Sequence, residues 1–371
     1  MRNANRNPVI QEDLARICDH DLPWRRLSGK TIFISGASGF LPAYMVETLL
    51  YWNEIEPSFA CRVIGLARNR ERAEQRFAHL LGRPDFSLVI QDVCSPIALE
   101  AEAEVDFIIH AASQASPKYF GRDPVGTLLA NTLGTHNLLC LAKDRGAQGF
   151  LFFSSGEVYG RVSGPGAVHE DAYGPLDPTD MRSCYGESKR LGETMCIAWH
   201  HQHGVPAKIV RISHTYGPGM ALDDGRVFAD FVANVVRHED VMLKSEGMAR
   251  RPFCYLADAT IAFFTVLLLG ESGQAYNVAN EDCQVSIAQL AKIVAGLFPE
   301  RKLAVRYAPG LTPSGYIRSK EEGASPDTSK IRKLGWRPIT TIEEGFRRTI
   351  ASFEWPAGEG FCDNQGENSR V

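Results

Sequence analysis

Short apolar segments alternate with helical segments over residues 31–212, and this alternation constrains the fold more than any other feature. Each apolar segment is a continuous run rich in branched and aromatic residues, which is typical of a buried strand. Strands are expected at 31–35, 62–66, 87–90, 105–109, 149–153, 207–212 and 274–278. Helices are expected between them, at 43–52, from residue 70, at 124–143 and from residue 183. Apolar strands separated by helices form a parallel sheet covered on both faces. The sequence therefore predicts an α/β fold with a doubly wound parallel sheet.

A glycine-rich turn joins the first strand to the first helix. Its sequence is Gly-Ala-Ser-Gly-Phe-Leu-Pro, at 36–42. Glycine lets the backbone turn sharply and approach a pyrophosphate, and the helix that follows offers free N–H groups and the positive end of its dipole. Pro42 stands where a third glycine is expected, and proline suits the first turn of a helix. The turn predicts a dinucleotide site formed by Gly36, Ser38, Gly39, Phe40 and Leu41.

Residues at the ends of the next strands would complete the dinucleotide site. Asp92 and Val93 end the third strand and are expected to meet the adenine. Ala111 and Ala112 end the fourth strand, where small side chains let a dinucleotide lie close to the backbone. Arg68 follows the second strand in place of the acidic residue that binds a ribose 2′-hydroxyl, and arginine there accommodates a 2′-phosphate. NAD and NADP both stay open as the cofactor.

Tyr185 and Lys189 form a candidate proton-transfer pair. They stand four residues apart in a segment that is expected to begin a helix, so their side chains point the same way. A free tyrosine has a pKa near 10 and is a poor base at neutral pH. A neighbouring lysine ammonium stabilises the phenolate and lowers the pKa of the tyrosine. The pair therefore predicts general acid–base chemistry beside the dinucleotide.

Composition and charge narrow the class of partner. The 371 residues are 44% hydrophobic and 23% charged, as in an ordinary soluble protein. A formal net charge of -4 gives no reason to expect nucleic acid or an anionic membrane as a partner. No apolar run approaches the roughly 20 residues of a spanning helix, and no apolar signal segment follows Met1. Nine cysteines without a Cys-x-x-Cys spacing indicate reduced thiols in a cytoplasm, and no recognisable metal-ligand set is present.

A series of motifs along residues 30–350 resembles the extended short-chain dehydrogenase/reductases of the NAD-dependent epimerase/dehydratase family. The motifs are the glycine turn, Asp92-Val93, residues 154–160, Tyr185-x-x-x-Lys189, residues 211–218, residues 251–255, and Pro326-Asp327 ahead of residues 334–338. Residues 155–160, 181–190 and 224–227 look most like those of UDP-glucuronic acid decarboxylases (UDP-xylose synthases). The resemblance implies a Rossmann domain, a smaller C-terminal α/β substrate lobe, a nucleotide sugar as substrate with a UDP-sugar favoured, and a homodimer.

The pattern along the chain also predicts its division into parts. We expect an N-terminal arm at 1–29 and a dinucleotide-binding Rossmann domain at 30–215. A nucleotide-sugar-binding lobe, interleaved with the Rossmann sheet, is expected at 216–355. The tail at 356–371 is rich in Gly, Asn and Asp and is expected to be flexible.

By the same resemblance, Tyr185 would remove the proton of the sugar 4-hydroxyl while C4 gives hydride to the nicotinamide. Ser155 would hydrogen-bond the same oxygen, and Lys189 would hold the ribose and tune Tyr185. Oxidation at C4 makes a C5 carboxylate a β-keto acid, which loses CO2 readily. Glu157 would organise proton movements at C5, and Arg251 would pair with the carboxylate or a phosphate. Further substrate contacts are expected from Ser116, His214 and Arg226.

Three positions depart from the decarboxylase pattern. Gly156 stands where decarboxylases carry serine and 4,6-dehydratases carry an acid, His214 stands in place of asparagine, and Gly219 stands in place of arginine. Because Gly156 cannot donate a proton, 4-epimerisation is the main alternative to decarboxylation, and dehydration is less favoured. A binding protein that senses NAD(P) without turnover is the alternative outside the enzymes. The intact set of Ser155, Tyr185 and Lys189 argues against it.

Overall fold

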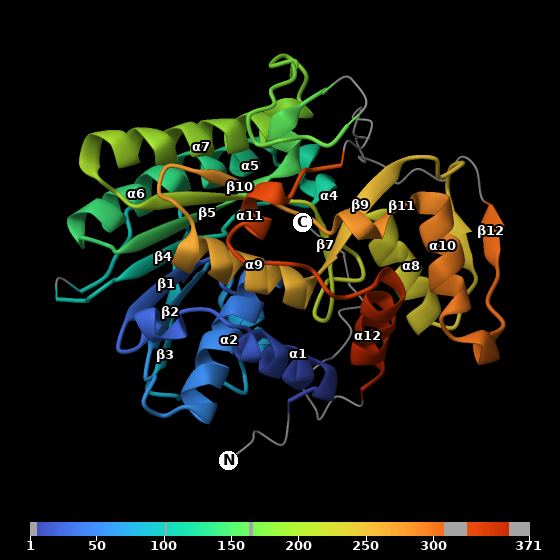
Figure 1. The fold of residues 1–371 in the computed structure, drawn as a ribbon, viewed down its shortest axis with the longest axis horizontal. Coiled ribbons are helices and arrows are strands. Elements are labelled where there is room, and N and C mark those ends of the chain that lie inside the picture. Colours follow the sequence, from blue (N-terminus) through green and yellow to red (C-terminus); the bar gives the residue numbers. More distant parts are fainter. Residues whose placement is uncertain (1–5, 101, 163–165, 308–324, 356–371) are drawn as a thin grey trace, which may run out of the picture.

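The computed structural model describes residues 6–100, 102–162, 166–307 and 325–355. Its centre is a seven-stranded sheet in the order β10-β6-β5-β4-β1-β2-β3, in which all pairs run parallel (Figure 1). The strands are β1 (Thr31–Ser35), β2 (Arg62–Ala67), β3 (Phe86–Ile90), β4 (Phe107–His110), β5 (Gly149–Ser155), β6 (Ala207–Ile212) and β10 (Ala275–Val278). The predicted α/β fold with a Rossmann parallel sheet is confirmed.

Helices cover both faces of this sheet, which explains why its strands are apolar on both sides. One face packs on α2 (Phe40–Ile55) and α9 (Leu256–Leu269), and α1 (Pro8–Asp19) packs on these two helices. The other face packs on α6 (Leu133–Asp144) and α7 (Ser183–His203), and α5 (Pro124–Asn131) packs on these two. Neighbouring residues of β1 divide between the faces: Ile32 and Ile34 join the first core, and Phe33 joins the second. The short helix α3 (Arg70–Arg76) follows β2.

The single helix predicted over 124–143 is wrong in one respect. The chain forms α5 and α6 in succession, with Thr132 between them at φ -113° and ψ -71°. The Thr132 amide is shared between the carbonyls of Leu128 and Leu129, and its hydroxyl donates to Leu128 O at 2.8 Å. The hydroxyl thus competes with the regular helical hydrogen bonds, a known cause of helix bending.

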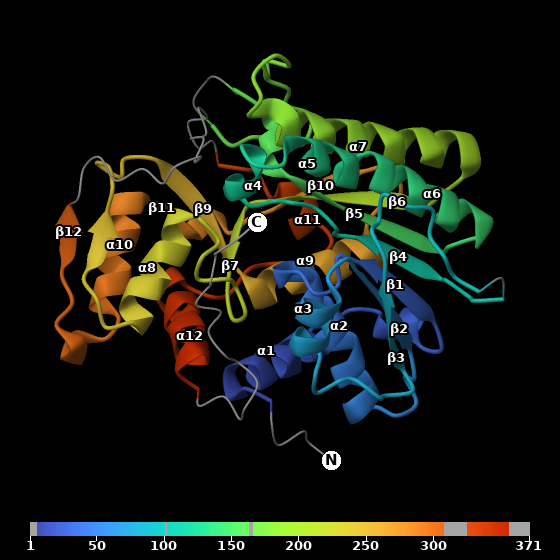
Figure 2. The ribbon, with the colours of Figure 1, turned by 180° about the vertical axis from the view of Figure 1, so that it is seen from behind.

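The C-terminal part of the chain builds a smaller body at one end of the sheet, as Figure 2 shows from behind. It contains a sheet in the order β11-β9-β7 and the pair β12-β8, packed with α8, α10 and α12. The bounds are β7 (His214–Tyr216), α8 (Val227–Val236), β8 (Val241–Leu243), β9 (Arg250–Tyr255), β11 (Gln284–Ser286), α10 (Ile287–Gly296), β12 (Val305–Tyr307) and α12 (Ile342–Glu354). Helix α9 packs on the large sheet and β10 is one of its edge strands. The chain therefore passes between the two bodies more than once. The domain boundary at residue 215 stays a prediction.

Short elements connect these parts. They are α4 (Pro117–Phe120), α11 (Ser329–Arg332) and the 3-10 turns η1 (Trp24–Leu27), η2 (Gly156–Tyr159), η3 (Glu281–Cys283) and η4 (Pro299–Arg301). The helix of the predicted N-terminal arm, α1, begins after Asn7, whose side chain accepts a hydrogen bond from the Val9 amide at 3.0 Å. It packs against α2, α9 and α12. The predicted tail at 356–371 lies outside the described residues.

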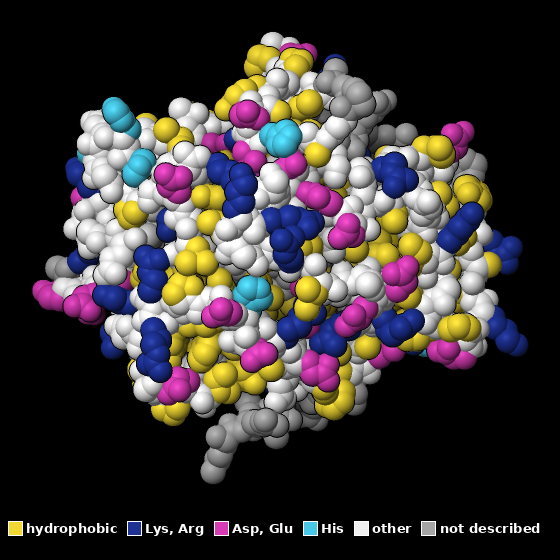
Figure 3. Space-filling view, viewed as in Figure 1, with side chains coloured by type: hydrophobic (Ala, Val, Ile, Leu, Met, Phe, Trp, Pro, Cys, Tyr) yellow, Lys and Arg dark blue, Asp and Glu magenta, His cyan; other side chains and the backbone are white. Residues whose placement is uncertain are grey.

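The surface mixes charges of both signs. Figure 3 shows Lys and Arg side chains interspersed with Asp and Glu over the face that carries α9 and α12. Among the described residues, every helix is too short or too polar to cross a membrane.

Candidate active site

A large cavity of about 2090 Å³ lies at the carboxyl ends of the sheet strands and extends to the smaller body. This is where parallel α/β sheets bind their ligands. The structure brings all the predicted site residues to its wall: Gly36, Ser38, Gly39, Phe40, Leu41, Arg68, Asp92, Val93, Ala111, Ala112, Ser116, Ser155, Glu157, Tyr185, Lys189, His214, Arg226 and Arg251. Residues that lie far apart in the sequence therefore meet in one place.

The glycine turn lies very close to the end of β4. Gly36 has φ +66°, and a Cβ there would stand 2.7 Å from the Cα of Ala112. The Gly39 amide donates to Gly36 O at 2.7 Å, and α2 begins at the next residue, Phe40. Pro42 occupies the first turn of α2, where its missing N–H has no helical partner to lose. The turn forms a tight backbone cradle at a helix N-terminus, which fits a dinucleotide pyrophosphate.

A buried network holds β1 and β4 in register beneath this cradle. The Ser35 hydroxyl lies 2.8 Å from His110 Nδ1, and the amides of Ala111 and Ala112 donate to it at 3.2 Å. His110 Nε2 lies 3.0 Å from the hydroxyl of Thr135. Burial lowers the pKa of His110 to about 3, with a further contribution from the charge of Lys189. The ring is therefore neutral and acts as a structural link between the two strand ends.

Arg68 and Asp92 face each other at the ends of β2 and β3. Their charged groups are 3.8 Å apart, and both side chains are largely exposed to solvent. Asn69, next to Arg68, accepts a hydrogen bond from the Arg72 amide at 2.8 Å and thereby begins α3. The arginine and the carboxylate lie together at the edge of the cavity predicted to hold the adenosine.

Tyr185 and Lys189 lie one turn apart on α7, both buried. Lys189 Nζ donates to Phe153 O at 2.6 Å and lies 5.8 Å from the centroid of the Tyr185 ring. Burial raises the pKa of Tyr185 to about 12, the Glu157 carboxylate adds to the rise, and a hydrogen bond with Ser155 opposes it. Burial lowers the pKa of Lys189 to about 7, and the charge of the nearby Glu193 opposes this shift. The net shift of Tyr185 is thus opposite to the one predicted from the lysine alone, because burial outweighs the favourable contacts.

Arg182 is a member of the site that sequence reasoning did not single out. Its guanidinium binds both carboxylate oxygens of Glu157, each at 2.7 Å. It also lies 4.7 Å from the centroid of the Phe120 ring, which in turn stacks on Tyr185 at 5.0 Å. The signal in the sequence was its place three residues before the tyrosine, within the motif at 181–190.

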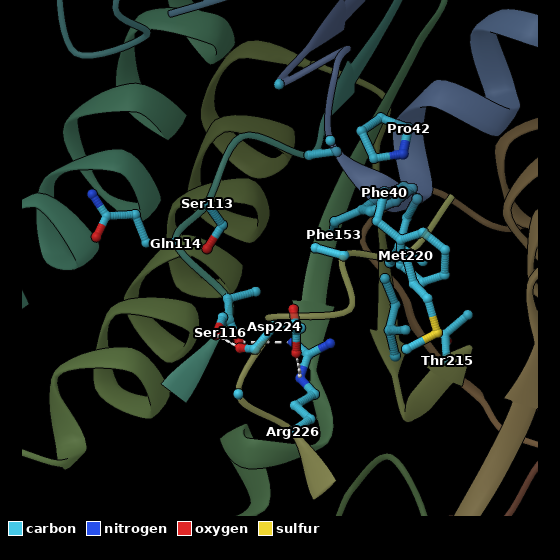
Figure 4. Close-up of a pocket in the computed structure, with 18 of the residues that line it drawn as sticks. Phe40, Pro42, Ser113, Gln114, Ser116, Phe153, Thr215, Met220, Asp224 and Arg226 are labelled. Carbon is cyan, nitrogen blue, oxygen red and sulfur yellow. Dashed lines mark hydrogen bonds and ion pairs between the residues drawn. The ribbon is translucent and has the colours of Figure 1, made fainter. Parts of the chain in front are cut away.

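Arg226, Ser116 and His214 also line the cavity. Arg226 Nη2 donates to Ala115 O at 2.9 Å, and its Nε lies 3.3 Å from Asp224. Ser116 donates to the backbone carbonyl of Asp224, as Figure 4 shows. Burial lowers the pKa of His214 to about 3, and the charges of Arg251 and Arg226 lower it further. A neutral imidazole near two guanidinium groups is suited to bind an anionic group through hydrogen bonds.

Apolar and small side chains gather in another part of the wall. Figure 4 shows Phe40, Phe153, Thr215 and Met220 grouped together, away from Ser116 and Arg226. The cavity therefore combines apolar side chains, cationic side chains and the Tyr185 hydroxyl, the pattern of a small-molecule site.

Comparison with known proteins defines the family. Residues 32–279 match the NAD dependent epimerase/dehydratase family. The chain is 33% identical over 320 residues to UDP-glucuronic acid decarboxylase 3 of Arabidopsis thaliana, covering 85% of this chain and 86% of the relative. It is 32% identical over 328 residues to UDP-glucuronic acid decarboxylase 1 of Xenopus tropicalis, covering 87% and 72%.

Solved structures give the same fold. UDP-glucuronic acid 4-epimerase from Bacillus cereus, in complex with UDP-glucuronic acid and NAD, matches with a TM-score of 0.72 at 20% identity, covering 87% of this chain and 99% of that one. dTDP-glucose 4,6-dehydratase from Bacillus anthracis, in complex with NAD, matches with a TM-score of 0.72 at 20% identity, covering 88% and 96%. The fold and site define an enzyme of the extended short-chain dehydrogenase/reductase class. Within that class, the chain belongs to the NAD dependent epimerase/dehydratase family, whose cofactor is NAD.

Proposed function

We propose that this protein is a nucleotide-sugar decarboxylase that oxidises C4 of a UDP-hexuronic acid transiently and releases CO2. The observation that carries the proposal is the meeting of Tyr185, Ser155 and the Arg182–Glu157 pair in the cavity that also contains the glycine cradle. The decarboxylases of Arabidopsis thaliana and Xenopus tropicalis, related over most of their length, support the choice of reaction.

The cofactor fits the chain's own residues. A Cβ at Gly36 would collide with Ala112, so only glycine allows the turn to lie this close to β4, and α2 begins immediately after the turn. Gly36 and Gly39 would face the pyrophosphate, and Lys189 would hold the nicotinamide ribose. When bound, NAD accepts hydride from C4 of the sugar and later returns it.

The protein's own side chains would move the protons. Tyr185 takes the proton of the 4-hydroxyl, and Ser155, its hydrogen-bond partner, binds the same oxygen. The resulting 4-keto sugar is a β-keto acid, so breaking the C5–C6 bond releases CO2 and leaves an enolate. Glu157 lies beside Tyr185 to organise the protonation at C5. Arg251 and Arg226 supply cations for the carboxylate and the diphosphate.

A second reaction, 4-epimerisation, is supported by Gly156. A Cβ built on this residue has no neighbour within 4 Å, so the space that a serine or an acid would fill is open. An epimerase needs Tyr185, Lys189 and Ser155 and needs no side chain at 156. The open space leaves room for the sugar ring to turn over between the two hydride transfers.

One experiment separates the reactions. The purified protein is incubated with UDP-, dTDP-, CDP- and GDP-sugars, and the products are followed by mass spectrometry and NMR. Decarboxylation predicts loss of the mass of CO2 from UDP-glucuronic acid, and epimerisation predicts unchanged mass with a new NMR spectrum. Absence of conversion of every sugar, with NAD still bound, would favour the sensing protein. The Tyr185→Phe variant is the control for adventitious activity.

We propose that the enzyme is a homodimer in a reducing cytoplasm. Exposed apolar side chains on α5, α6 and α7 support the dimer: Val125, Leu128, Leu129, Leu133, Leu191 and Ile197. The eight cysteines of the described residues are free thiols, which supports the compartment. Light scattering at several concentrations tests the dimer, and Leu191→Glu is expected to shift it toward the monomer.

A further inference from the structure

Four side chains form a continuous array across the cavity wall. Tyr185 stacks on Phe120 with ring centroids 5.0 Å apart and an interplanar angle of 20°. The Arg182 guanidinium lies 4.7 Å from the centroid of Phe120. Arg182 then binds both oxygens of Glu157 at 2.7 Å, in an ion pair whose side chains are only 12% and 24% exposed. The array connects the acid–base residue to the carboxylate through one aromatic ring and one guanidinium.

This arrangement places a negative charge close to a hydroxyl that has to lose a proton. The Glu157 carboxylate raises the pKa of Tyr185, second only to burial, whereas Arg182 lowers it. In a buried site a like charge next to a forming phenolate is costly, and an opposite charge that neutralises it removes much of that cost. Arg182 is bound in the two-pronged geometry that only arginine provides.

We propose that Arg182 is a positioning residue that fixes the Glu157 carboxylate and sets the pH at which Tyr185 gives up its proton. The proposal rests on the proposed function, because it concerns the same acid–base step. Arg182 does not need to touch the sugar for this role. Arg182 binds both oxygens of Glu157 and thereby fixes the direction of the carboxylate. Its contact with the ring of Phe120 fixes the direction of the guanidinium itself.

Other charged groups that face Tyr185 are already bound to other partners. Arg226, just before α8, lowers the pKa of Tyr185 but also lies 3.3 Å from Asp224. Lys189, on the same helix, donates to Phe153 O. The Cys184 thiol lies near both Glu157 and Arg182, and burial raises its pKa. Glu157 is the carboxylate whose charge raises the pKa of Tyr185, so its pairing with Arg182 is the contact to test.

The test measures the pH dependence of kcat and, without turnover, the titration of Tyr185. The titration is the tyrosinate absorbance difference between each protein and its Tyr185→Phe counterpart. Arg182→Gln leaves the charge of Glu157 uncompensated. The midpoint of the kcat profile and the midpoint of the Tyr185 titration are therefore both expected to move to higher pH by about 1 unit or more. Glu157→Gln is expected to move the titration to lower pH, and the double variant to return it near the wild-type value. Arg182→Lys should restore the midpoint in part, with a lower kcat.

Arg190→Gln is the matched control. Arg190 lies on the same helix and also binds η2, but through the backbone oxygen of Val158 at 2.7 Å. Its loss is expected to lower thermal stability without moving either midpoint.

The inference is overturned if Arg182→Gln loses activity equally at every pH with both midpoints unmoved, or if Arg190→Gln shifts them as much. Where Arg182→Gln does not fold, Arg182→Lys and Glu157→Gln decide through the titration alone. If the wild-type protein converts no substrate, that result counts against the proposed function. The titration of Tyr185 needs no turnover, so it still tests the role of Arg182.

Discussion

Two buried clusters of tyrosine, carboxylate and arginine in the described part of the chain differ in which group binds the carboxylate. In the cavity, Arg182 takes both oxygens of Glu157, and Tyr185 has Ser155 as its hydrogen-bond partner. A second cluster, the Asp13 cluster, lies where α1, α2 and α12 meet.

In the Asp13 cluster the tyrosines themselves bind the carboxylate. The hydroxyls of Tyr255 and Tyr44 donate to Asp13 at 2.7 and 3.2 Å, and Arg348 donates to it at 2.8 Å. Burial raises the pKa of both tyrosines well above the usual value, with the charge of Asp13 adding to the rise. A tyrosine whose proton is held by a carboxylate is a structural donor. A tyrosine whose neighbouring carboxylate is held by arginine keeps its oxygen free to exchange a proton with a substrate.

Removing the two hydroxyls in turn gives the largest expected contrast. Tyr185→Phe should lower kcat on the order of 10²–10⁴-fold, the usual contribution of general acid–base catalysis, while NAD still binds. Tyr255→Phe should leave kcat per folded molecule unchanged and lower the free energy of unfolding by about 1 kcal/mol. Steady-state kinetics, bound-cofactor content and urea unfolding measure these effects. Equal losses of kcat in both variants would end the distinction between the clusters.

Removal of the carboxylate tests the structural cluster next. Asp13→Ala leaves two tyrosine hydroxyls and a guanidinium without their buried acceptor, so the free energy of unfolding should fall by about 3 kcal/mol. The matched control is Glu12→Ala, one residue away, because Glu12 is exposed and binds the same Arg348 at 2.9 Å. It should change the free energy of unfolding by less than about 0.5 kcal/mol. Similar values for the two variants would show that the buried cluster contributes no more than a surface pair.

The pH dependence of NAD binding sharpens the view of the catalytic side. Burial lowers the pKa of Lys189 to about 7, and Glu193 opposes the shift. In the proposed function the ammonium form of Lys189 binds the ribose, and it loses its proton as pH rises through this value. Affinity for NAD should therefore be highest below pH 7 and weaken above it, and Glu193→Gln should move that weakening to lower pH. Titration calorimetry measures the affinity, and a wild-type profile as flat as that of Lys189→Met would refute the role of the ammonium.

The smallest expected effect is on stability at Gly156. A serine there projects into open space, so Gly156→Ser should change the free energy of unfolding by less than about 0.5 kcal/mol. The substitution should instead change the ratio of products. The added hydroxyl should increase the share of decarboxylation over epimerisation, as measured by NMR of the reaction mixture. An unchanged product ratio would mean that this position does not control the reaction.

The sequence predicted the parts of the fold and site that depend on local pattern. The strands of the sheet follow from apolar runs, and the pyrophosphate cradle follows from a glycine turn between a strand and a helix. The division of the helix at Thr132 was missed because helical periodicity continues across it, and only the backbone hydrogen bonds reveal the break. The order of the strands along the sheet brings Ser35 and His110 together, and no local signal carries that order.

Contacts between distant side chains account for what was missed in the site. In the sequence, Arg182 is one of several charged residues near the start of α7. Only the structure shows that it binds the Glu157 carboxylate. The direction of the Tyr185 pKa was also wrong for a physical reason. Spacing on a helix predicts the neighbour Lys189, but it contains no information on burial, which dominates the shift.

In the proposed reaction, Tyr185 and NAD oxidise C4 and return the same hydride within one active site. The most direct measurement uses UDP-glucuronic acid with deuterium at C4 and follows the product by mass spectrometry and NMR. We expect a product that has lost CO2 and keeps the deuterium at C4, with no conversion by Tyr185→Phe. A decarboxylated product without deuterium at C4, or full conversion by Tyr185→Phe, would contradict the account.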